Sequence, residues 1–298
     1  MRSNAGWEGQ AFRGVLGYNP AFGFFLASVM AVGHYENFPV GSLLLPRHLR
    51  AGVHSVYRFA RHADDVADEG DASPDDRLNA LWALDAELDR IKTGQAALTP
   101  LMQDLAQTIK VYALPLEPFY DLLSAFRQDV VKTRYQDFGE LMDYCRRSAN
   151  PVGRLMLALY GENDVRFLAM ADGICSALQL INFLQDVAVD WDKGRVYLPA
   201  DDMAVFDVGE QQIADGDAGG NWSSLMLKQI ERARLMLQAG APLGKQLRGR
   251  IGLELRLIVM GGDRILQKLH QCRGDVFRSR PVLGWRDWVV MLWRALCA

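Results

Sequence analysis

Helical spacing of apolar residues, interrupted by prolines, runs through most of the chain and is the feature that most constrains its fold. Alternating runs of Val, Ile, Tyr and Thr bounded by turn residues, which would indicate strands, are almost absent. Because proline does not continue a helix beyond its first turn, the prolines divide the pattern into separate helices. We expect helices at 47–69, 74–93, 101–112, 117–132, 138–160, 164–191, 222–239, 243–271 and 285–297. The sequence therefore predicts an all-α fold.

The composition suffices for one large domain or two small ones, since half of the 298 residues are hydrophobic (50%). No linker separates the expected helices. The longest irregular piece, residues 199–221, carries six acidic residues and no Lys or Arg, so it is expected to cross the surface.

Charge and cysteine content exclude several classes of function. The formal net charge is -3, and no run of Lys and Arg forms a stripe that would follow phosphates, so nucleic acid is not an expected partner. Cysteines occur at positions 145, 175, 272 and 297 without a Cys-x-x-Cys pair, so neither a zinc site nor a disulfide scaffold is indicated. The most apolar run, residues 21–33, is too short to span a bilayer, and the HYENFP that follows it is a poor signal cleavage site. We expect a cytoplasmic protein.

A row of polar side chains lies within the apolar stretch LINFLQDVAVDWDKGRVYLP, residues 180–199. Asn182, Asp186 and Asp190 follow one another at steps of four. On a helix this spacing places them on one face, with neighbouring Cβ atoms about 5–6 Å apart. Burying carboxylates in apolar surroundings costs free energy unless they have a positively charged partner. This row therefore predicts a bound cation or a neighbouring basic side chain.

A second acidic row lies in YRFARHADDVADEG, residues 57–70, where Asp64 and Asp68 stand four apart with Asp65 beside them. A single row of this kind is more often a solvated helix face. Two rows favour another interpretation, because a cation between them would offset both like-charge repulsion and carboxylate burial. Oxygen ligands without clustered His or Cys suit Mg²⁺, which shares its coordination with substrate phosphate. We therefore predict that Mg²⁺ and a diphosphate bind between the rows.

Basic residues accompany both rows. Arg61 lies one turn before Asp64, and Lys193 and Arg195 follow Asp190. They either pair with those aspartates or grip the oxygens of a departing diphosphate, and we favour the second role. Nearby aromatic residues are more often core than walls facing a carbocation, although ring faces do stabilise cations. These are Tyr57, Phe59, Phe183 and Tyr197.

Other site classes have no support in the sequence. The five histidines show no HExxH spacing, and no G-x-S-x-G elbow, phosphate-binding loop or Gly-rich dinucleotide fingerprint is present. We expect no nicotinamide cofactor.

The two rows and their surroundings resemble the squalene/phytoene synthase family of head-to-head prenyl-transferring enzymes. The matching motifs are Y-x-x-x-R-x-x-D-D-x-x-D at Tyr57 to Asp68 and Q-x-x-N-x-x-x-D-x-x-x-D at Gln179 to Asp190, followed by GRVYLP. The similarity covers about residues 34–283. It implies a single isoprenoid-synthase-like helical bundle over 34–298 after an N-terminal extension at 1–33. It also implies that the aspartate rows lie at the mouth of a central apolar cavity.

The resemblance implies a role for each matching residue. The implied catalytic residues are Asp64, Asp68, Asp186, Asp190, Arg61 and Tyr57. The implied metal ligands are Asp64, Asp65, Asp68, Asn182, Asp186 and Asp190. The implied substrate-binding residues are His34, Asn37, Arg61, Gln179, Asn182, Lys193, Arg195, Tyr197, Arg146 and Gly262.

Further segments are similar to the bacterial hopanoid-pathway members of the family, which convert presqualene diphosphate and water into hydroxysqualene. These segments are HYENFPVGSLLLP at 34–46, ANPVGR at 149–154, IVMGGDRIL at 258–266 and DVFRSRPVLGWRDW at 275–288. Condensing relatives have tyrosines where this chain has Arg146 and Gly262. We expect Gly262 to leave space for a water near the carbocation, with Arg146 nearby. Two alternatives stay open: a synthase that condenses two prenyl diphosphates, and a non-catalytic member that binds partners.

The tail at residues 273–298 combines five arginines and two aspartates with Trp285, Trp288 and Trp293. This composition suits either the interface of an anionic membrane or packing against the catalytic domain. Peripheral attachment to the inner face of the cytoplasmic membrane and contact with other enzymes of the pathway are therefore expected options.

Overall fold

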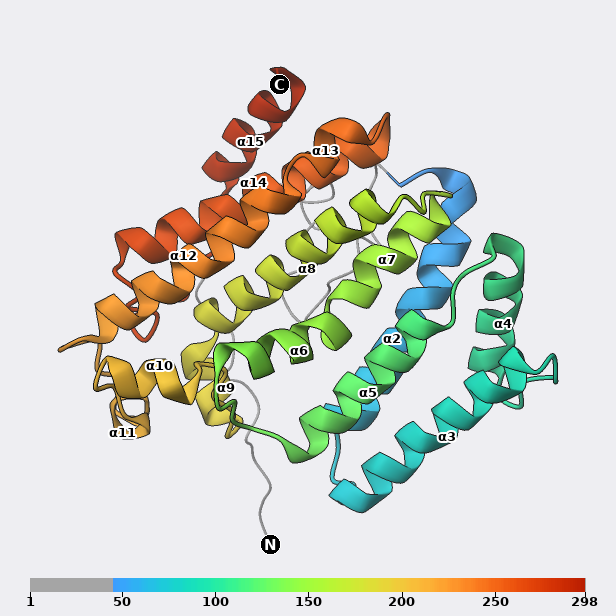
Figure 1. Ribbon diagram of the computed structural model, residues 1–298, viewed down its shortest axis with the longest axis horizontal. Helices are drawn as coiled ribbons and strands as arrows, with labels where there is room; N and C mark the ends of the chain where they lie inside the picture. Colours follow the sequence, from blue (N-terminus) through green and yellow to red (C-terminus); the bar gives the residue numbers. More distant parts are fainter. Residues whose placement is uncertain (1–44, 298) are drawn as a thin grey trace, which may run out of the picture.

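The computed structural model describes residues 45–297, and in that range the chain is built from helices (Figure 1). The only extended pairing among the described residues is an isolated bridge between Arg134 and Val196. The predicted all-α fold is confirmed. His34, Asn37 and the predicted boundary between residues 33 and 34 lie outside the described residues.

The helices of the described range follow one another in this order: η1 (Arg47–Leu49), α2 (Arg50–Asp68), α3 (Pro74–Lys92), α4 (Pro100–Tyr112), α5 (Glu117–Val131), α6 (Phe138–Ser148), α7 (Asn150–Leu159), α8 (Val165–Gln185), α9 (Val187–Asp192), α10 (Ala200–Val205), α11 (Glu210–Ala214), α12 (Trp222–Gly240), α13 (Leu243–Gln246), α14 (Arg250–Gln271) and α15 (Trp285–Cys297).

Several helices begin where the prolines and capping residues predict. The Ser73 hydroxyl accepts a hydrogen bond from the backbone N–H of Asp76, and Pro74 opens α3. Thr99 caps α4 in the same way ahead of Pro100. A side-chain oxygen at this position satisfies a backbone N–H that has no partner within the helix, and proline in the first turn loses no helical hydrogen bond.

Three predicted helices are wrong in their continuity. The predicted helix 138–160 is divided at Ala149, because Pro151 opens a new helix. The predicted helix 164–191 is divided at Asp186, where the backbone leaves helical geometry. The predicted helix 243–271 is divided before Arg250, since Gly249 adopts a positive φ of 74°. The predicted irregular piece 199–221 also contains two short helices, α10 and α11.

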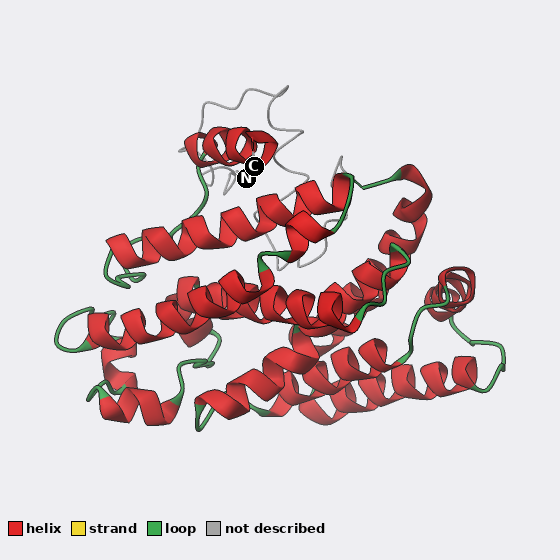
Figure 2. Cartoon of the chain, turned by 45° about the horizontal axis from the view of Figure 1, so that its top comes forward, coloured by secondary structure: helices red, strands yellow, loops and turns green. Residues whose placement is uncertain are grey.

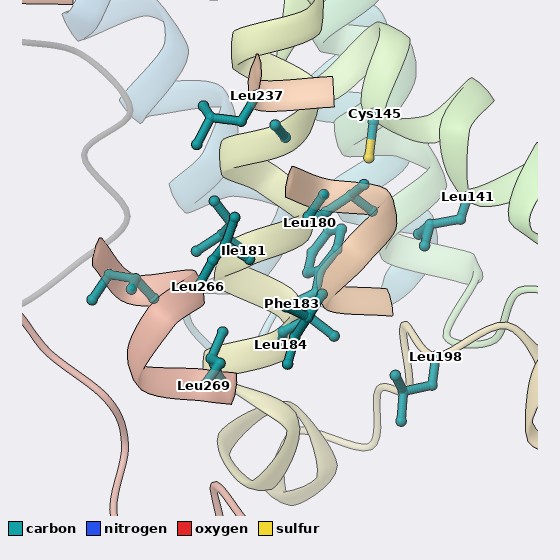
Figure 3. Packing of buried hydrophobic residues seen from close by; sticks show 14 of the residues in the cluster. Leu141, Cys145, Leu180, Ile181, Phe183, Leu184, Leu198, Leu237, Leu266 and Leu269 are labelled. Carbon is teal, nitrogen blue, oxygen red and sulfur yellow. The ribbon is translucent and has the colours of Figure 1, made fainter. Parts of the chain in front are cut away.

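α8 lies at the centre of the molecule, with α7 and α12 beside it (Figure 1). Its side chains Leu180 and Ile181 pack with Leu237 of α12 and Leu266 of α14 in one large apolar core (Figure 3). α8 is the one helix in the described range that is long and apolar enough to cross a membrane. Its position in the core accounts for that composition.

A second core joins the first half of the chain. It contains buried side chains of α2, α3, α4, α5 and α7, with Phe59 and Phe119 in edge-to-face contact at 5.4 Å between ring centroids. The helices stack in layers, and α15 lies on the outer side of α14 (Figure 2). α2 belongs to the second core, whereas α8 belongs to the first, so the two acidic rows come from different halves of the molecule.

Candidate active site

A pocket lies between α2, α5, α6, α8 and the segment that follows α9. Acidic and basic side chains line one part of it, and apolar side chains line another. The lining residues are Tyr57, Ala60, Arg61, Asp64, Asp68, Leu122, Phe126, Asp129, Tyr144, Ser148, Val152, Gln179, Phe183, Asp190, Lys193, Arg195 and Tyr197. The structure therefore brings together residues of both predicted motifs.

The row on α2 contributes Asp64 and Asp68 to the pocket. One turn earlier, the Arg61 guanidinium lies 3.3 Å from Asp64 and 2.6 Å from Asp65. It also donates a hydrogen bond of 2.8 Å to Glu69. Asp65 itself is not among the lining residues, so its predicted role as a metal ligand stays a prediction.

The second row reaches the pocket through Asp190, which is buried. Asp186 is buried as well, and Arg280 donates hydrogen bonds to both of its carboxylate oxygens. Asp186 stands at the break between α8 and α9, but the backbone N–H of Asp190 still bonds the Asp186 carbonyl at 2.7 Å. Asn182 is half-buried and is not among the lining residues.

An ion pair joins the two halves of the molecule across this pocket. The Arg195 guanidinium donates two hydrogen bonds to Asp68, one of them 2.9 Å long. It also donates to the backbone carbonyl of Asp129 at 3.3 Å. Burial alone would raise the pKa of Asp68, but the hydrogen bond and charge of Arg195 outweigh it and lower that pKa. Arg195 thus makes one of the two predicted contacts, a pair with an aspartate, and its role in gripping diphosphate oxygens stays a prediction.

Two carboxylates of the predicted motifs have strongly raised pKa values in the pocket. Burial, and then the nearby charge of Asp68, raise the pKa of Asp64 to about 6. Burial, and then the charge of Asp186, raise the pKa of Asp190 to about 7. Both shifts mean that nearby positive charge does not offset the burial of these carboxylates. Such raised pKa values are typical of functional sites.

Several buried polar atoms of the pocket have no hydrogen-bond partner within the described residues. They are Asp129 Oδ1, Ser148 Oγ, Gln179 Oε1 and Asp190 Oδ2. Leaving a buried polar group unsatisfied costs about 1–3 kcal/mol, so their concentration around one pocket indicates a polar ligand.

The donor chemistry of this pocket fits a hard divalent cation. Asp64 and Asp190 supply carboxylate oxygens with raised pKa values, and Asp190 Oδ2 is buried without a hydrogen bond. Among the described residues that line the pocket there is no histidine or cysteine, and Mg²⁺ prefers oxygen ligands. Within the described range no three His, Cys, Asp or Glu side chains are grouped closely enough to hold a metal ion by themselves. The lining carboxylates Asp64 and Asp68 come from α2, and Asp190 comes from α9.

Asp129 and Tyr144 are pocket residues that the sequence reasoning missed. The Tyr144 hydroxyl donates a hydrogen bond of 2.9 Å to Asp129, and burial is the main cause that raises the pKa of this carboxyl to about 7. Asp129 lies on α5, outside both motifs. The spacing of Tyr144 and Ser148, four apart on α6, was the available signal, because it places both on one helix face.

Aromatic rings surround the inner part of the pocket. Phe183 and Tyr197 stack with 3.8 Å between ring centroids, and Tyr144 lies 6.1 Å from Tyr197. Tyr57 lines the same pocket. The ring faces carry negative partial charge, so this wall suits a positively charged intermediate.

Two predicted residues lie elsewhere. Arg146 is on the exposed side of α6, 3.0 Å from Asp143, and is not among the lining residues. Gly262 packs in the core, where an added Cβ would lie 3.1 Å from Leu178 and from Leu237. The expectation that Gly262 leaves space for a water is therefore wrong, because neighbouring side chains already fill that space.

The part of the chain that forms this site is similar to known proteins. A family model described as squalene/phytoene synthase matches residues 31–287. The hydroxysqualene synthase of Rhodopseudomonas palustris is 38% identical over 241 residues, which cover 78% of this chain and 79% of that protein. A phytoene synthase of Mycobacterium tuberculosis is 33% identical and covers 65% of this chain and 69% of its own length. The crystal structure of squalene synthase HpnC from Alicyclobacillus acidocaldarius superimposes with a TM-score of 0.75 at 38% identity, over 80% of this chain and 90% of that one.

Proposed function

The chain belongs to the squalene/phytoene synthase family of prenyl-diphosphate-processing enzymes, and we propose that it converts presqualene diphosphate and water into hydroxysqualene and diphosphate. The observation that carries this choice is the similarity to hydroxysqualene synthases, at 34–38% identity over most of both chains. The pocket supports the family chemistry, because it combines carboxylates that could hold a metal, positively charged side chains that could bind a diphosphate, and an aromatic wall.

Departure of diphosphate begins the reaction. Arg61, Lys193 and Arg195 line the acidic part of the pocket and can donate hydrogen bonds to the leaving oxygens. Mg²⁺ held by Asp64, Asp68, Asp186 and Asp190 would neutralise negative charge that develops on the diphosphate. For this to occur, Arg195 and Arg280 must exchange their carboxylate partners, since they pair with Asp68 and Asp186.

The carbocation left behind rearranges within the apolar part of the pocket. Phe126, Val152 and Phe183 exclude water there, while the faces of the aromatic rings stabilise positive charge. Premature capture by water is limited in this way. The side chains hold the carbocation away from the polar end until rearrangement is complete.

Capture by one water molecule completes the proposed reaction. The water oxygen forms a bond to the cationic carbon and then loses a proton. Asp129 is placed to accept that proton, because its Oδ1 is buried in the pocket without a hydrogen bond and its pKa is raised to about 7. This assignment replaces the water site that the sequence suggested beside Gly262.

Labelled water tests the proposal. Purified enzyme, presqualene diphosphate and Mg²⁺ in ¹⁸O-water should give a C30 alcohol that carries one ¹⁸O atom, with no nicotinamide added. Mass spectrometry of the product measures this directly. An unlabelled alcohol would contradict water capture.

A condensing synthase is the second candidate, supported by the similarity to phytoene synthases at 31–33% identity. Such an enzyme would join two prenyl diphosphates. Incubation with farnesyl diphosphate alone and with geranylgeranyl diphosphate alone separates the two functions, because only a condensing enzyme would join two molecules of either.

The proposed location is the cytoplasm. Cys145, Cys175 and Cys272 are free thiols, as is usual in a reducing compartment. Contact with other enzymes of the pathway stays part of this proposal.

A further inference from the structure

One face of α15 is fixed to the body of the protein. Trp288, Met291 and Ala295 are buried against Leu257 of α14 in a small apolar cluster. The tail therefore packs against the catalytic domain, which was one of the two options that its sequence left open. In Figure 2 this helix, beside the C label, is the outermost of the described helices on its side.

A network of charged groups holds the start of α15 in place. Asp287 is buried and accepts hydrogen bonds from Arg264 at 2.6 Å, from Lys268 at 2.5 Å and from the backbone N–H of Gly284 at 2.8 Å. Hydrogen bonds between charged partners are the stronger kind. The orientation of α15 is therefore set, and so is the face that it presents outward.

The outward face of α15 carries large apolar side chains. Trp285 and Trp293 are 66% and 67% exposed, and Val289 and Val290 are each 48% exposed. Trp285, Val289 and Trp293 follow one another at steps of four and form one row along the helix. Contiguous exposed apolar surface of this kind marks an interaction site more often than ordinary surface.

Basic side chains lie beside this apolar row. Arg286 and Arg294 are exposed and stand four residues on either side of Val290, so they form a second row with it. The Arg286 guanidinium lies 5.3 Å from the centre of the Trp285 ring. The one acidic residue of the helix, Asp287, is buried in the network described above. The outward charge of α15 is therefore entirely positive.

From this arrangement we infer that the outward face of α15 is a docking surface for an anionic lipid bilayer. Tryptophan rings favour the boundary between headgroups and acyl chains, and arginines attract anionic headgroups. α15 would lie in the plane of that boundary, with Trp285 and Trp293 inserted and Arg286 and Arg294 among the phosphates. This inference goes beyond the proposed reaction and does not depend on it.

A second copy of this chain fits the same face less well. If two α15 helices paired through a twofold axis, each copy would bring the same two arginines to the contact. Their like charges would repel each other with no exposed acidic group on α15 to offset them. Anionic headgroups supply the opposite charge instead.

Flotation of the full chain with lipid vesicles tests the inference. Wild-type protein should float with phosphatidylcholine vesicles that contain phosphatidylglycerol, and far less with phosphatidylcholine alone. Arg286→Gln/Arg294→Gln should weaken partitioning onto the anionic vesicles about thirty-fold, given about 1 kcal/mol for each basic residue at such a surface. Trp285→Ser/Trp293→Ser should weaken it more than tenfold, because tryptophan contributes a large apolar area.

Matched variants elsewhere control for changes in charge and aromatic content. Arg58→Gln/Arg166→Gln removes two exposed arginines, and Trp82→Ser removes a tryptophan that is 56% exposed. Both should float like wild type. Equal losses in the controls and the α15 variants would overturn the inference. It would also be overturned if wild type failed to float and ran as a dimer that Trp285→Ser/Trp293→Ser converted to monomer.

Discussion

At the scale of single residues, the pocket is notable for carboxylates whose charge is poorly matched by their surroundings. Asp64, Asp129 and Asp190 all have pKa values raised mainly by burial. A raised pKa means that the folded protein favours the protonated carboxyl, so ionisation at neutral pH costs stability. These buried carboxylates therefore lower the stability of the folded protein, and a cationic ligand or intermediate in the pocket would restore it.

Asp129 gives a measurable pH dependence of stability. Its pKa rises from 3.8 to about 7 on folding, so its stabilising effect is complete below about pH 4 and is lost as the pH rises through 7. Asp129→Asn should therefore be more stable than wild type at pH 8. The free energy of unfolding of Asp129→Asn, relative to wild type, should be higher at pH 8 than at pH 5 by on the order of 2 kcal/mol. This follows because each unit of pKa difference corresponds to about 1.4 kcal/mol.

Urea unfolding at pH 5 and pH 8 measures this difference. Asp71→Asn is a suitable control, because Asp71 is an exposed aspartate of a surface turn. If wild type and Asp129→Asn lost stability in parallel across this range, the carboxyl of Asp129 would not be desolvated.

At the scale of elements, α8 and α12 approach each other closely near the start of α8 and the end of α12. Gly240 at the end of α12 lies directly against α8, where a Cβ would come within 2.5 Å of the Met170 carbonyl oxygen. Gly173 of α8 faces the same contact, but a Cβ there would stay 3.4 Å from the Met236 carbonyl oxygen. The two glycines therefore differ in how much space they leave.

Alanine substitutions should separate these glycines. Gly240→Ala should reduce the free energy of unfolding by about 1–3 kcal/mol, because the helix backbones must move apart. Gly173→Ala should be neutral or stabilise by up to about 1 kcal/mol, since alanine favours a helix and meets only ordinary contacts. Thermal unfolding of both variants measures the effect. If Gly240→Ala were as stable as wild type, the helices would not be closely packed at Gly240.

The elements also show what the sequence could and could not predict. Helical spacing of apolar residues and the positions of prolines predict the helices on either side of each break. Both signals are local, because they depend only on residues a few positions apart. The break at Asp186 was not predicted, because apolar residues continue through it and its hydrogen bond to Arg280 spans 94 positions. Asp129 was missed for the same reason, since only packing brings α5 beside the two motifs. Gly262 was misread because a glycine in the sequence does not show whether its space is filled.

At the scale of the whole molecule, the pocket is formed where two halves with separate cores meet. α2 carries Asp64 and Asp68 from one half, and α8 and α9 carry Asp186 and Asp190 from the other. A ligand that bridges both rows therefore also joins both halves. Such a ligand should stabilise the folded protein as a whole rather than one helix.

Thermal shift with Mg²⁺ and inorganic diphosphate tests this arrangement without any turnover. Together they should raise the Tm by several degrees at saturating concentration, whereas either alone should have a smaller effect. Asp64→Asn should abolish the joint effect, and Asp104→Asn, on the outer surface of α4, should retain it. An equal shift in Asp64→Asn and wild type would remove Asp64 from the proposed metal site.

The two arginine–aspartate pairs described above have a consequence for the enzyme's cycle. Arg195 on Asp68 and Arg280 on Asp186 serve as internal counter-ions, so in the proposed site a metal ion would compete with the protein's own side chains for these carboxylates. That competition would lower the intrinsic affinity for metal, and a diphosphate would offset it by offering the displaced arginines new partners. Binding of metal and diphosphate would thereby be coupled, and by the same linkage the return of each arginine to its aspartate would favour release of both after turnover.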